Sequence, residues 1–248
     1  MILETCSHSL RKGRRAGFTL IELLVVISIV AVLAGLSLPV ISNVKESGNS
    51  ASCISNLKQI GVALDLFAAD NNNDFPPLTT KDGVYAGKDW DFGVILPYLP
   101  GRNKAGQASQ VENSIFVCPS AKYTGLTSAN ISRTYSSAES MIGYNSTNGS
   151  YDVWTNQRKR TNLASLPGTL LLFDGVRDGT NSYCKLEVPW VTLTGSADLS
   201  ATAKTSTYID YRHSKAFHAL YADGHVDTIA RAKASTVVTK TAWTGVAQ

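Results

Sequence analysis

The longest apolar stretch of the chain runs from Phe18 to Leu38 and contains one ionisable side chain, Glu22. As an α-helix, these 21 residues would extend roughly 30 Å, which matches the hydrocarbon thickness of a bilayer. The pattern therefore predicts one membrane-spanning helix. Four basic residues precede the stretch and only Lys45 closely follows it. The positive-inside rule then predicts a cytoplasmic amino terminus and an exported remainder.

A helical period resumes after Pro39. Apolar residues recur at intervals of four and three and would form one stripe: Cys53, Leu57, Ile60, Leu64 and Phe67. The polar run Asn71-Asn72-Asn73-Asp74 and the pair Pro76-Pro77 are stop signals. We therefore expect a nearly continuous helix from Phe18 to about Asp70, whose second half is amphipathic and packs on a globular head.

The remaining chain predicts short strands and long loops. Leu170 to Phe173 is an apolar run that ends at Asp174-Gly175, as a short buried strand would. Apolar positions alternate on both sides of Asp223-Gly224, which predicts a hairpin from Ala216 to Ala230 with a type I′ turn. Residues 100–160 are polar and rich in turn formers. The fold class is therefore α+β, a long helix packed on a small antiparallel β-sheet.

The charge of the chain does not favour nucleic acid as a partner. The net charge of +4 arises mostly in residues 1–17, which hold four basic residues and Glu4. Without them, 19 basic and 18 acidic residues remain. A near-neutral chain lacks the basic surface that phosphate binding requires.

The start of the apolar stretch departs from an ordinary secretory signal. Small residues, Ala16 and Gly17, precede the stretch, and no A-x-A pattern follows it. The run Arg15-Ala16-Gly17-Phe18-Thr19-Leu20-Ile21-Glu22 resembles the processing site of type IV pilins and type II secretion pseudopilins. This resemblance implies that prepilin peptidase, a membrane aspartic peptidase, cuts between Gly17 and Phe18 and that Phe18 is then N-methylated.

The resemblance also implies a location and partners. The expected location is the bacterial inner membrane, with a single pass and an extracytoplasmic head in the periplasm or on a surface filament. The expected partners are the peptidase, other pilin or pseudopilin subunits, and an inner-membrane assembly platform. Residues 1–17 would be a leader, 18–42 the transmembrane and assembly helix, 43–75 its amphipathic continuation, and 76–248 the head.

Glu22 has a physical role in this scheme. A carboxylate at membrane depth costs about 2.5 to 3.5 kcal/mol on insertion scales, so it requires a partner. Cleavage would create an ammonium at Phe18, which could meet Glu22 of the same chain or of a neighbour in a filament. The alternative is an uncleaved signal anchor whose glutamate lies in the headgroup layer.

A second pattern extends the resemblance along the chain. His213, nine further residues, and then Asp223-Gly224 match the H-x9-D-G signature of a large group of pilin-like proteins with the same cleavage motif. Cys53 followed by Asn56-Leu57-Lys58-Gln59-Ile60-Gly61, the run Leu96 to Leu99, and Cys118-Pro119-Ser120 fit the same group. Where members often carry Ser-Tyr-Gly-x-Asn, this chain has Ile142-Gly143-Tyr144-Asn145.

Removal of the leader would leave three of the four cysteines, because Cys6 would be lost. One pairing, Cys53 with Cys118, would tie the head to the helix. Pairing that involves Cys184, or three free thiols, are the alternatives. No cysteine spacing resembles a zinc ribbon.

Two clusters could carry chemistry. His213, His218, Asp223 and His225 are either turn residues with local hydrogen bonds, or a metal site, or a hydrolytic site; in a tight hairpin, His225 would face Ala222. Residues 70–75 are either a helix cap and turn or a calcium site, although they lack the EF-hand glycine and glutamate. The four tryptophans are more typical of core and rim positions than of a sugar-binding platform.

No nucleophile with a paired base is recognisable, so we expect a structural protein and not an enzyme. No cofactor is expected, apart from the calcium left open above. The expected function is a structural subunit of a type IV pilus or type II secretion pseudopilus. The alternative is a membrane-tethered extracytoplasmic binding module for metal, glycan or a secreted client, which keeps the pilin start for sorting.

Overall fold

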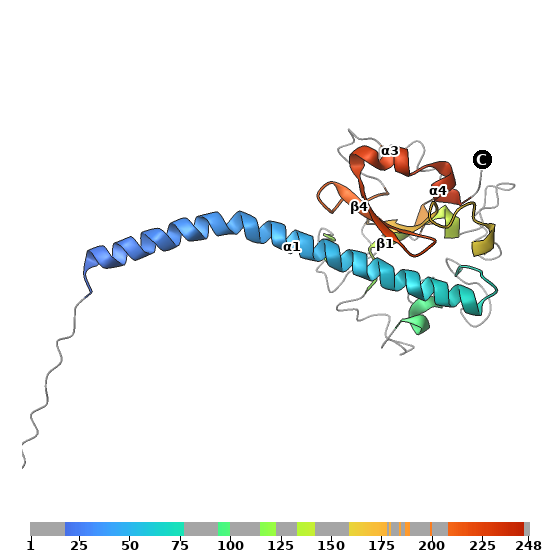
Figure 1. Ribbon diagram of the computed structural model, residues 1–248, viewed down its shortest axis with the longest axis horizontal. Coiled ribbons are helices and arrows are strands. Elements are labelled where there is room, and N and C mark those ends of the chain that lie inside the picture. The colour runs from blue at the N-terminus through green and yellow to red at the C-terminus, as the bar shows by residue number, and fades with distance from the viewer. Residues whose placement is uncertain are drawn as a thin grey trace, which may run out of the picture. The chain divides into compact units, whose positions relative to one another are not determined.

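The structure is a computed structural model (Figure 1) that describes residues 18–76, 94–99, 115–122, 133–141, 159–177, 179, 184, 187–188, 199 and 208–245. The leader, Cys6 and Gly17 lie outside the described residues, as do Ile142 to Asn145. The chain divides into two compact units, Met1–Lys45 and Glu46–Gln248. Each unit is described by itself.

Helix α1 (Leu20–Asp70) confirms the predicted helix and ends where the asparagines begin. Asn72 and Asn73 adopt positive φ values of 54° and 61°, a conformation that asparagine tolerates better than most residues. The Asn71 side chain donates to the Phe67 carbonyl at 2.8 Å, and the Asn73 N–H donates to the Ala68 carbonyl at 2.8 Å. These bonds satisfy carbonyls that the helix end leaves without partners.

In the first unit, the large apolar side chains of α1 and of Phe18 face outward. From Phe18 to Leu33 their exposed fractions lie between 49% and 87%. Across the part of the chain that the structure describes, no helix combines the length and apolarity needed to cross a bilayer. The predicted membrane span from Phe18 to Leu38 is therefore not confirmed.

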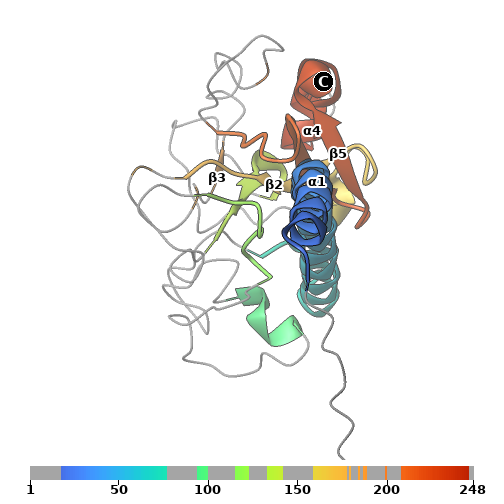
Figure 2. The ribbon, with the colours of Figure 1, turned by 90° about the vertical axis from the view of Figure 1, so that its left-hand side faces the viewer.

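In the second unit, five strands form one sheet in the order β3-β1-β2-β4-β5. They are β1 (Tyr135–Ala138), β2 (Leu170–Asp174), β3 (Glu187–Val188), β4 (Ala216–Tyr221) and β5 (Val226–Ala230). The pairs β1/β2, β2/β4 and β4/β5 are antiparallel, as expected, whereas the short edge strand β3 pairs with β1 in parallel. In Figure 2, β2 lies between β5, which is near α1, and β3.

The predicted hairpin is confirmed as β4 and β5, but its predicted type I′ turn is wrong. The Gly224 N–H donates to the Tyr221 carbonyl at 2.9 Å, and the Tyr221 N–H donates to the His225 carbonyl at 2.9 Å. The loop therefore has three residues, and among them only Gly224 has a positive φ, 87°. This loop, a type I turn followed by a left-handed residue, spares Asp223 the positive φ that a type I′ turn would impose.

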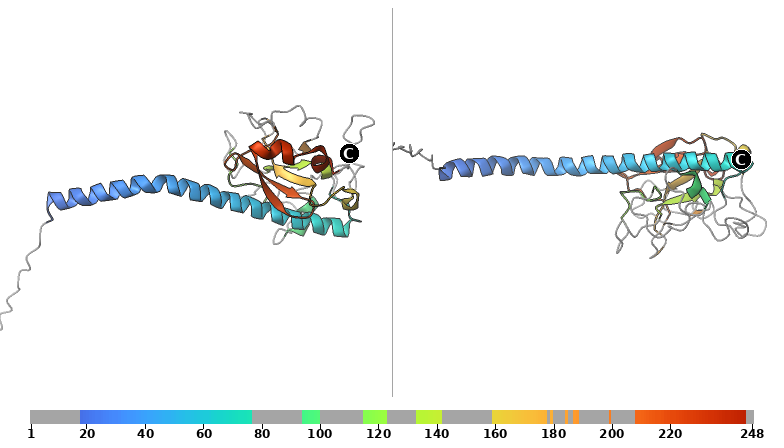
Figure 3. Two further views of the ribbon diagram at one scale, coloured as in Figure 1. Left: turned by 45° about the horizontal axis from the view of Figure 1, so that its top comes forward. Right: turned by 90° about the horizontal axis from the view of Figure 1, so that it is seen from below.

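The sheet separates two apolar clusters. On one face, Leu172 and Leu220 pack with the predicted stripe of α1, whose residues Cys53, Leu57, Ile60, Leu64 and Phe67 are all at most 1% exposed. On the other face, Phe173 and Phe217 pack with Trp243 and the C-terminal helices α3 (Ala234–Val237) and α4 (Lys240–Thr244). The left panel of Figure 3 shows α3 and α4 above the sheet, on the face opposite α1.

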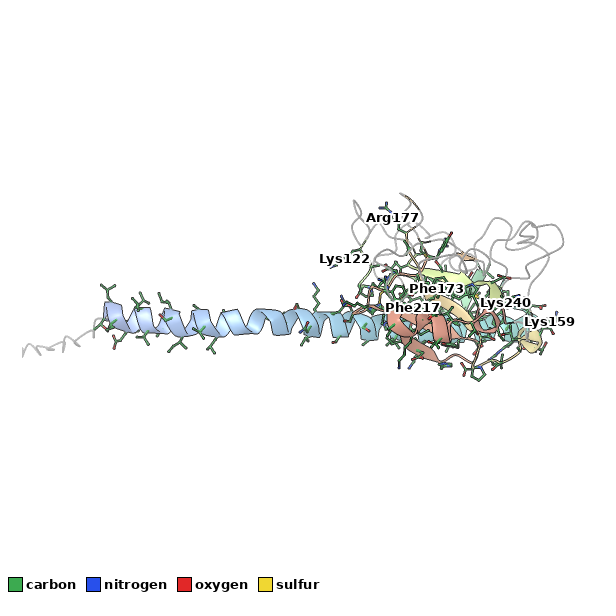
Figure 4. The ribbon with its side chains drawn as sticks, turned by 90° about the horizontal axis from the view of Figure 1, so that it is seen from above. Lys122, Lys159, Phe173, Arg177, Phe217 and Lys240 are labelled. Carbon is green, nitrogen blue, oxygen red and sulfur yellow. A yellow bond between two sulfur atoms is a disulfide. The ribbon has the colours of Figure 1, made fainter. Side chains whose placement is uncertain are left out.

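Figure 4 shows Phe173 and Phe217 inside the second unit, while Lys122, Lys159 and Arg177 lie at its periphery. Four 3-10 helices complete the described elements: η2 (Leu96–Tyr98), η4 (Glu139–Met141), η5 (Arg160–Asn162) and η7 (Arg231–Lys233).

Because side chains alternate along β4, His218 lies on the α1 face between Phe217 and Ala219, which face the other cluster. This alternation brings His218 to the helix.

Candidate functional site

The amino end of α1 carries the residues of the processing motif that the structure describes. The Thr19 N–H and hydroxyl both donate to Glu22 Oε2 at 2.9 Å, and the Glu22 N–H lies 3.3 Å from Thr19 Oγ1. This reciprocal pattern is a capping box, in which a threonine and a glutamate three residues later satisfy amides at the helix start. The spacing Thr-x-x-Glu was readable in the sequence, but our sequence analysis missed it. Phe18 is 76% exposed.

His213 lies in the second unit, at the turn that leads into β4. Ser214 and Lys215 have positive φ values of 50° and 67°, and His213 and Ala216 exchange backbone hydrogen bonds of 3.0 and 2.8 Å across them. The ring is buried, with 4% of the residue exposed, and it stacks on His218 with centroids 4.0 Å apart. The tight turn therefore directs His213 inward.

Three groups from distant parts of the chain surround the His213 ring. Nε2 lies 3.3 Å from Cys118 Sγ and 3.4 Å from Asp174 Oδ2. Nδ1 lies 3.4 Å from Glu46 Oε1. Neither Glu46 nor a role for Asp174 beyond ending a strand was predicted from the sequence. The signal for Asp174 was its place directly after four buried apolar residues, where a carboxylate requires partners.

Cys118 is joined to Cys53 in a disulfide, which ties α1 to the segment 115–122. Of the pairings that the sequence left open, this is the one the structure contains. Cys184 is buried and has a free thiol, and burial raises the pKa of that thiol. Cys53, Cys118 and His213 come close enough to suggest metal ligands. The disulfide sulfurs, however, are not the thiolates that bind metals.

Asp174 is fully buried at the end of β2. Its Oδ2 accepts the His218 N–H at 2.8 Å, and its Oδ1 lies 3.8 Å from Arg212 Nε. Burial raises the pKa of Asp174 to about 7, although the Arg212 charge and the His218 N–H oppose the rise. Arg212 also contacts Asp210 Oδ2 at 3.0 Å and donates to the Gly175 carbonyl at 2.6 Å.

The two stacked histidines are neutral at physiological pH. Burial, assisted by the nearby Arg212 charge, lowers the pKa of His213 to about 4. Burial and the neighbouring His213 lower the pKa of His218 to about 3. The two ring nitrogens of His218 lie 2.9 Å from Ser50 Oγ and 2.9 Å from Thr228 Oγ1. Hydroxyl groups, which suit a neutral imidazole, thus satisfy His218.

The other half of the histidine cluster lies at the opposite end of β4. His225 Nδ1 is 2.5 Å from Asp223 Oδ1, and the His225 N–H donates to the same oxygen at 3.1 Å. Slight burial raises the pKa of Asp223, but the hydrogen bonds from His225 outweigh it and lower the pKa overall. His225 pairs with Tyr221 and stacks on its ring at 4.2 Å, so the expectation that it faces Ala222 is wrong.

The structure therefore does not bring the H-x9-D-G residues together. His213 lies before β4, and Asp223 and Gly224 form the turn after it. The four residues of the predicted cluster separate into a buried pair, His213 with His218, and an exposed pair, Asp223 with His225. The buried pair is connected to Asp174, Glu46 and the disulfide, whereas the exposed pair serves the turn.

Comparisons with known proteins match two regions of the chain. Residues 12–38 match the family described as Prokaryotic N-terminal methylation motif. Residues 42–182, more than half of the chain, match the family described as Protein of unknown function (DUF1559). No solved structure matches the chain significantly.

Among curated proteins, the chain is similar to several type II secretion system core proteins G. The protein of Aeromonas hydrophila is 38% identical over 77 residues, which cover 31% of this chain and 52% of that protein. The protein of Klebsiella pneumoniae is 40% identical over 73 residues, 29% of this chain and 50% of that protein. The protein of Pseudomonas aeruginosa is 31% identical over 101 residues, 37% of this chain and 69% of that protein.

The chain spans about half the length of the first of these relatives. The two family matches cover residues 12–38 and 42–182, and the long helix with a small sheet is consistent with a pilin-like α+β fold. The chain is therefore a pilin-like protein that carries the prokaryotic N-terminal methylation motif and belongs to the DUF1559 family.

Proposed function

We propose that the protein is a subunit of a type II secretion pseudopilus or a type IV pilus, cut after Gly17 and assembled through α1. The observation that carries this proposal is the methylation motif over residues 12–38 at the start of a 51-residue helix. The similarity to type II secretion system core proteins G favours a secretion filament.

The exposed side chains of α1 supply the driving force for assembly. Twelve large apolar side chains between Phe18 and Leu33 are about half exposed or more: Phe18, Leu20, Ile21, Leu23, Leu24, Val25, Val26, Ile27, Ile29, Val30, Val32 and Leu33. In the membrane, lipid covers this surface. In a filament, neighbouring helices cover it, and each fully buried side chain of this size contributes about 1.5 to 3 kcal/mol relative to exposure in water.

Glu22 gives the assembly its register. After cleavage, the Phe18 ammonium lies four residues from the Glu22 carboxylate, at a helix start where a cation is unfavourable and an anion is favourable. A parallel neighbour displaced along the filament brings its ammonium to the same carboxylate. The pair then neutralises both charges in an apolar surrounding, where neither charge is tolerated alone.

This function requires prepilin peptidase, further pilin or pseudopilin subunits, and an assembly platform in the inner membrane. The amino terminus of the precursor lies in the cytoplasm and the head lies outside it. The head, residues 76–248, then decorates the filament or contacts the other components. No catalytic activity is part of this role.

Two variants of Glu22 test the proposal and separate charge from helix capping. Glu22→Ala removes both the charge and the capping box, whereas Glu22→Gln keeps hydrogen bonding at that position and removes only the charge. We expect both variants to insert into the membrane and to reach sheared filaments at least about tenfold less than the wild type, because each leaves the ammonium without its counter-charge.

The readout is the amount of the chain in sheared fibres relative to the membrane fraction. Wild-type protein that appears stoichiometrically in the fibres supports a structural subunit. Wild-type protein that remains wholly with the membrane would identify a tethered binding module instead. Normal assembly of Glu22→Gln would contradict the proposed ion pair between Glu22 and the Phe18 ammonium.

A further inference from the structure

The second unit contains a pocket of about 400 Å³, which is lined by the part of α1 from Glu46 to Ile54, by His213 and Ser214 before β4, and by Thr228 of β5. Two titratable side chains line it, Glu46 from α1 and His213, together with the hydroxyl-bearing residues Ser50 and Thr228. The Glu46 side chain is 38% exposed, so the pocket is open to solvent. The filament role proposed above uses neither Glu46 nor His213.

The surroundings of His213 determine which ring nitrogen carries the proton. A disulfide sulfur has no hydrogen to donate, and Cys118 Sγ lies 3.3 Å from Nε2. These neighbours favour a proton on Nε2, with Asp174 Oδ2 at 3.4 Å as a second acceptor. Nδ1 then has a free lone pair.

His213 lines the pocket, and its Nδ1 is buried and has no hydrogen-bond partner. The nearest charged atom is Glu46 Oε1, at 3.4 Å. A lone pair and a carboxylate are both acceptors, so they repel each other unless a positive species lies between them. An unsatisfied buried nitrogen also costs about 1 to 3 kcal/mol. A bound cation would remove both penalties.

We propose that His213 Nδ1 and Glu46 bind a divalent metal ion of the zinc class in this pocket. Zinc binds nitrogen and carboxylate oxygen at about 2.0 to 2.2 Å, so two ligands at the tetrahedral angle lie about 3.4 Å apart. The observed separation of Nδ1 and Oε1 is 3.4 Å. A metal at this position lies off the line between the two atoms, which agrees with the lack of hydrogen-bond geometry at Nδ1.

The second layer of contacts fits the same ion. Ligating histidines commonly donate their other N–H to a carboxylate, which fixes the ring and strengthens the ligand. Asp174 has this position relative to Nε2. The Ser120 hydroxyl lies 3.3 Å from both oxygens of Glu46 and holds the second ligand. The remaining coordination positions are open to water or to an added ligand.

The donor set selects the class of metal. One imidazole and one carboxylate favour zinc and its transition-metal neighbours over calcium and magnesium, which prefer oxygen ligands alone. The nearby sulfurs do not contribute, because they form a disulfide. The exposed pair His225 and Asp223 is already hydrogen-bonded and lies beyond the other end of β4.

Zinc titration of the full chain in detergent tests the proposal, with a chromophoric chelator as competitor. Glu46→Gln is the informative variant because Glu46 is partly exposed, so the fold should be retained, as an unchanged unfolding midpoint of the zinc-free protein would verify. We expect one zinc ion per wild-type chain, at least about tenfold weaker binding by Glu46→Gln, and loss of binding in His213→Gln.

His225→Gln is the matched control because it removes a histidine paired with a carboxylate outside the pocket; its zinc affinity should equal that of the wild type. Excess calcium should fail to displace the zinc. Absence of stoichiometric zinc in the wild type, equal affinity of a folded Glu46→Gln, loss of binding in His225→Gln, or displacement by an equal concentration of calcium would each overturn the proposal. None of these outcomes depends on filament assembly.

Discussion

At the scale of single residues, the most unusual feature is the buried group of Asp174, His213 and His218 beside Arg212. As pH falls, the neutral histidines and the Asp174 carboxyl, whose pKa is raised, change the stability of the fold in opposite directions. In the unfolded chain both histidines bind protons below a pKa of about 6.5. In the folded chain they bind protons only below a pKa of about 4 for His213 and about 3 for His218. The histidines therefore make the fold less stable as pH falls below about 6.5.

Asp174 acts in the other direction. Its carboxyl holds a proton in the folded chain up to a pKa of about 7, but in the unfolded chain only up to about 3.8, so it stabilises the fold as pH falls through that window. Asp174→Asn removes this contribution and can keep an acceptor for the His218 N–H. We expect a steeper loss of stability between pH 6.5 and 4.5 in Asp174→Asn than in the wild type.

Urea unfolding of the full chain in detergent, with a chelator present, measures this slope. Asp223→Asn is the control because a hydrogen-bonded carboxyl with a lowered pKa loses its contribution only below that window. An equal or shallower slope in Asp174→Asn would contradict the assignment of the raised pKa.

The sequence could indicate some of these residues but not their partners. Glu22 stood out because a charge in an apolar run requires an explanation, and His213 because of its spacing from Asp223-Gly224. The neighbours of His213 come from α1, from the segment at Cys118 and from the end of β2. Only the folded chain brings these segments together, and no local sequence pattern predicts that they come into contact.

At the scale of elements, two glycines of α1 test how closely the helix packs on β4. A Cβ at Gly61 would lie 2.9 Å from Leu220 Cδ1, an atom of a fully buried side chain, whereas a Cβ at Gly48 would meet nothing within 4 Å. We expect Gly48→Ala to raise the free energy of unfolding by up to about 1 kcal/mol through helix propensity. Gly61→Ala should lower it by about 1 to 2 kcal/mol, because overpacking outweighs the same gain.

Chemical denaturation of the two variants in parallel provides the comparison. Equal stabilisation of both would show that the helix can move away from Leu220 at no cost.

Element patterns were the most predictable part of the fold. The stripe from Cys53 to Phe67 and the hairpin from Ala216 to Ala230 follow directly from the periods of 3.6 and 2. The turn type was not predictable from Asp223-Gly224, because the same dipeptide serves two-residue and three-residue loops. The parallel edge strand β3 and the irregularity between Leu170 and Leu172 in β2 depend on tertiary pairing.

At the scale of the whole molecule, the chain joins an amino-terminal methylation motif to a head that the motif itself does not specify. The methylation motif matches residues 12–38 and includes the start of α1, and the DUF1559 match begins at residue 42, close to the division between the two units after Lys45. The sequence pattern did not predict that α3, α4 and Trp243 cover the second face of the sheet. Both helices are only one turn long or little more, which is too short for a helical period to be recognised.

The mass of the mature amino terminus shows directly whether the chain is cut after Gly17. Intact and peptide mass spectrometry of the protein isolated from membranes or filaments would measure it. The account predicts a chain that has lost residues 1–17 and starts with a phenylalanine, Phe18, carrying one added methyl group. A mature chain that retains residues 1–17 would contradict the account, because the ammonium that pairs with Glu22 could not then exist at Phe18.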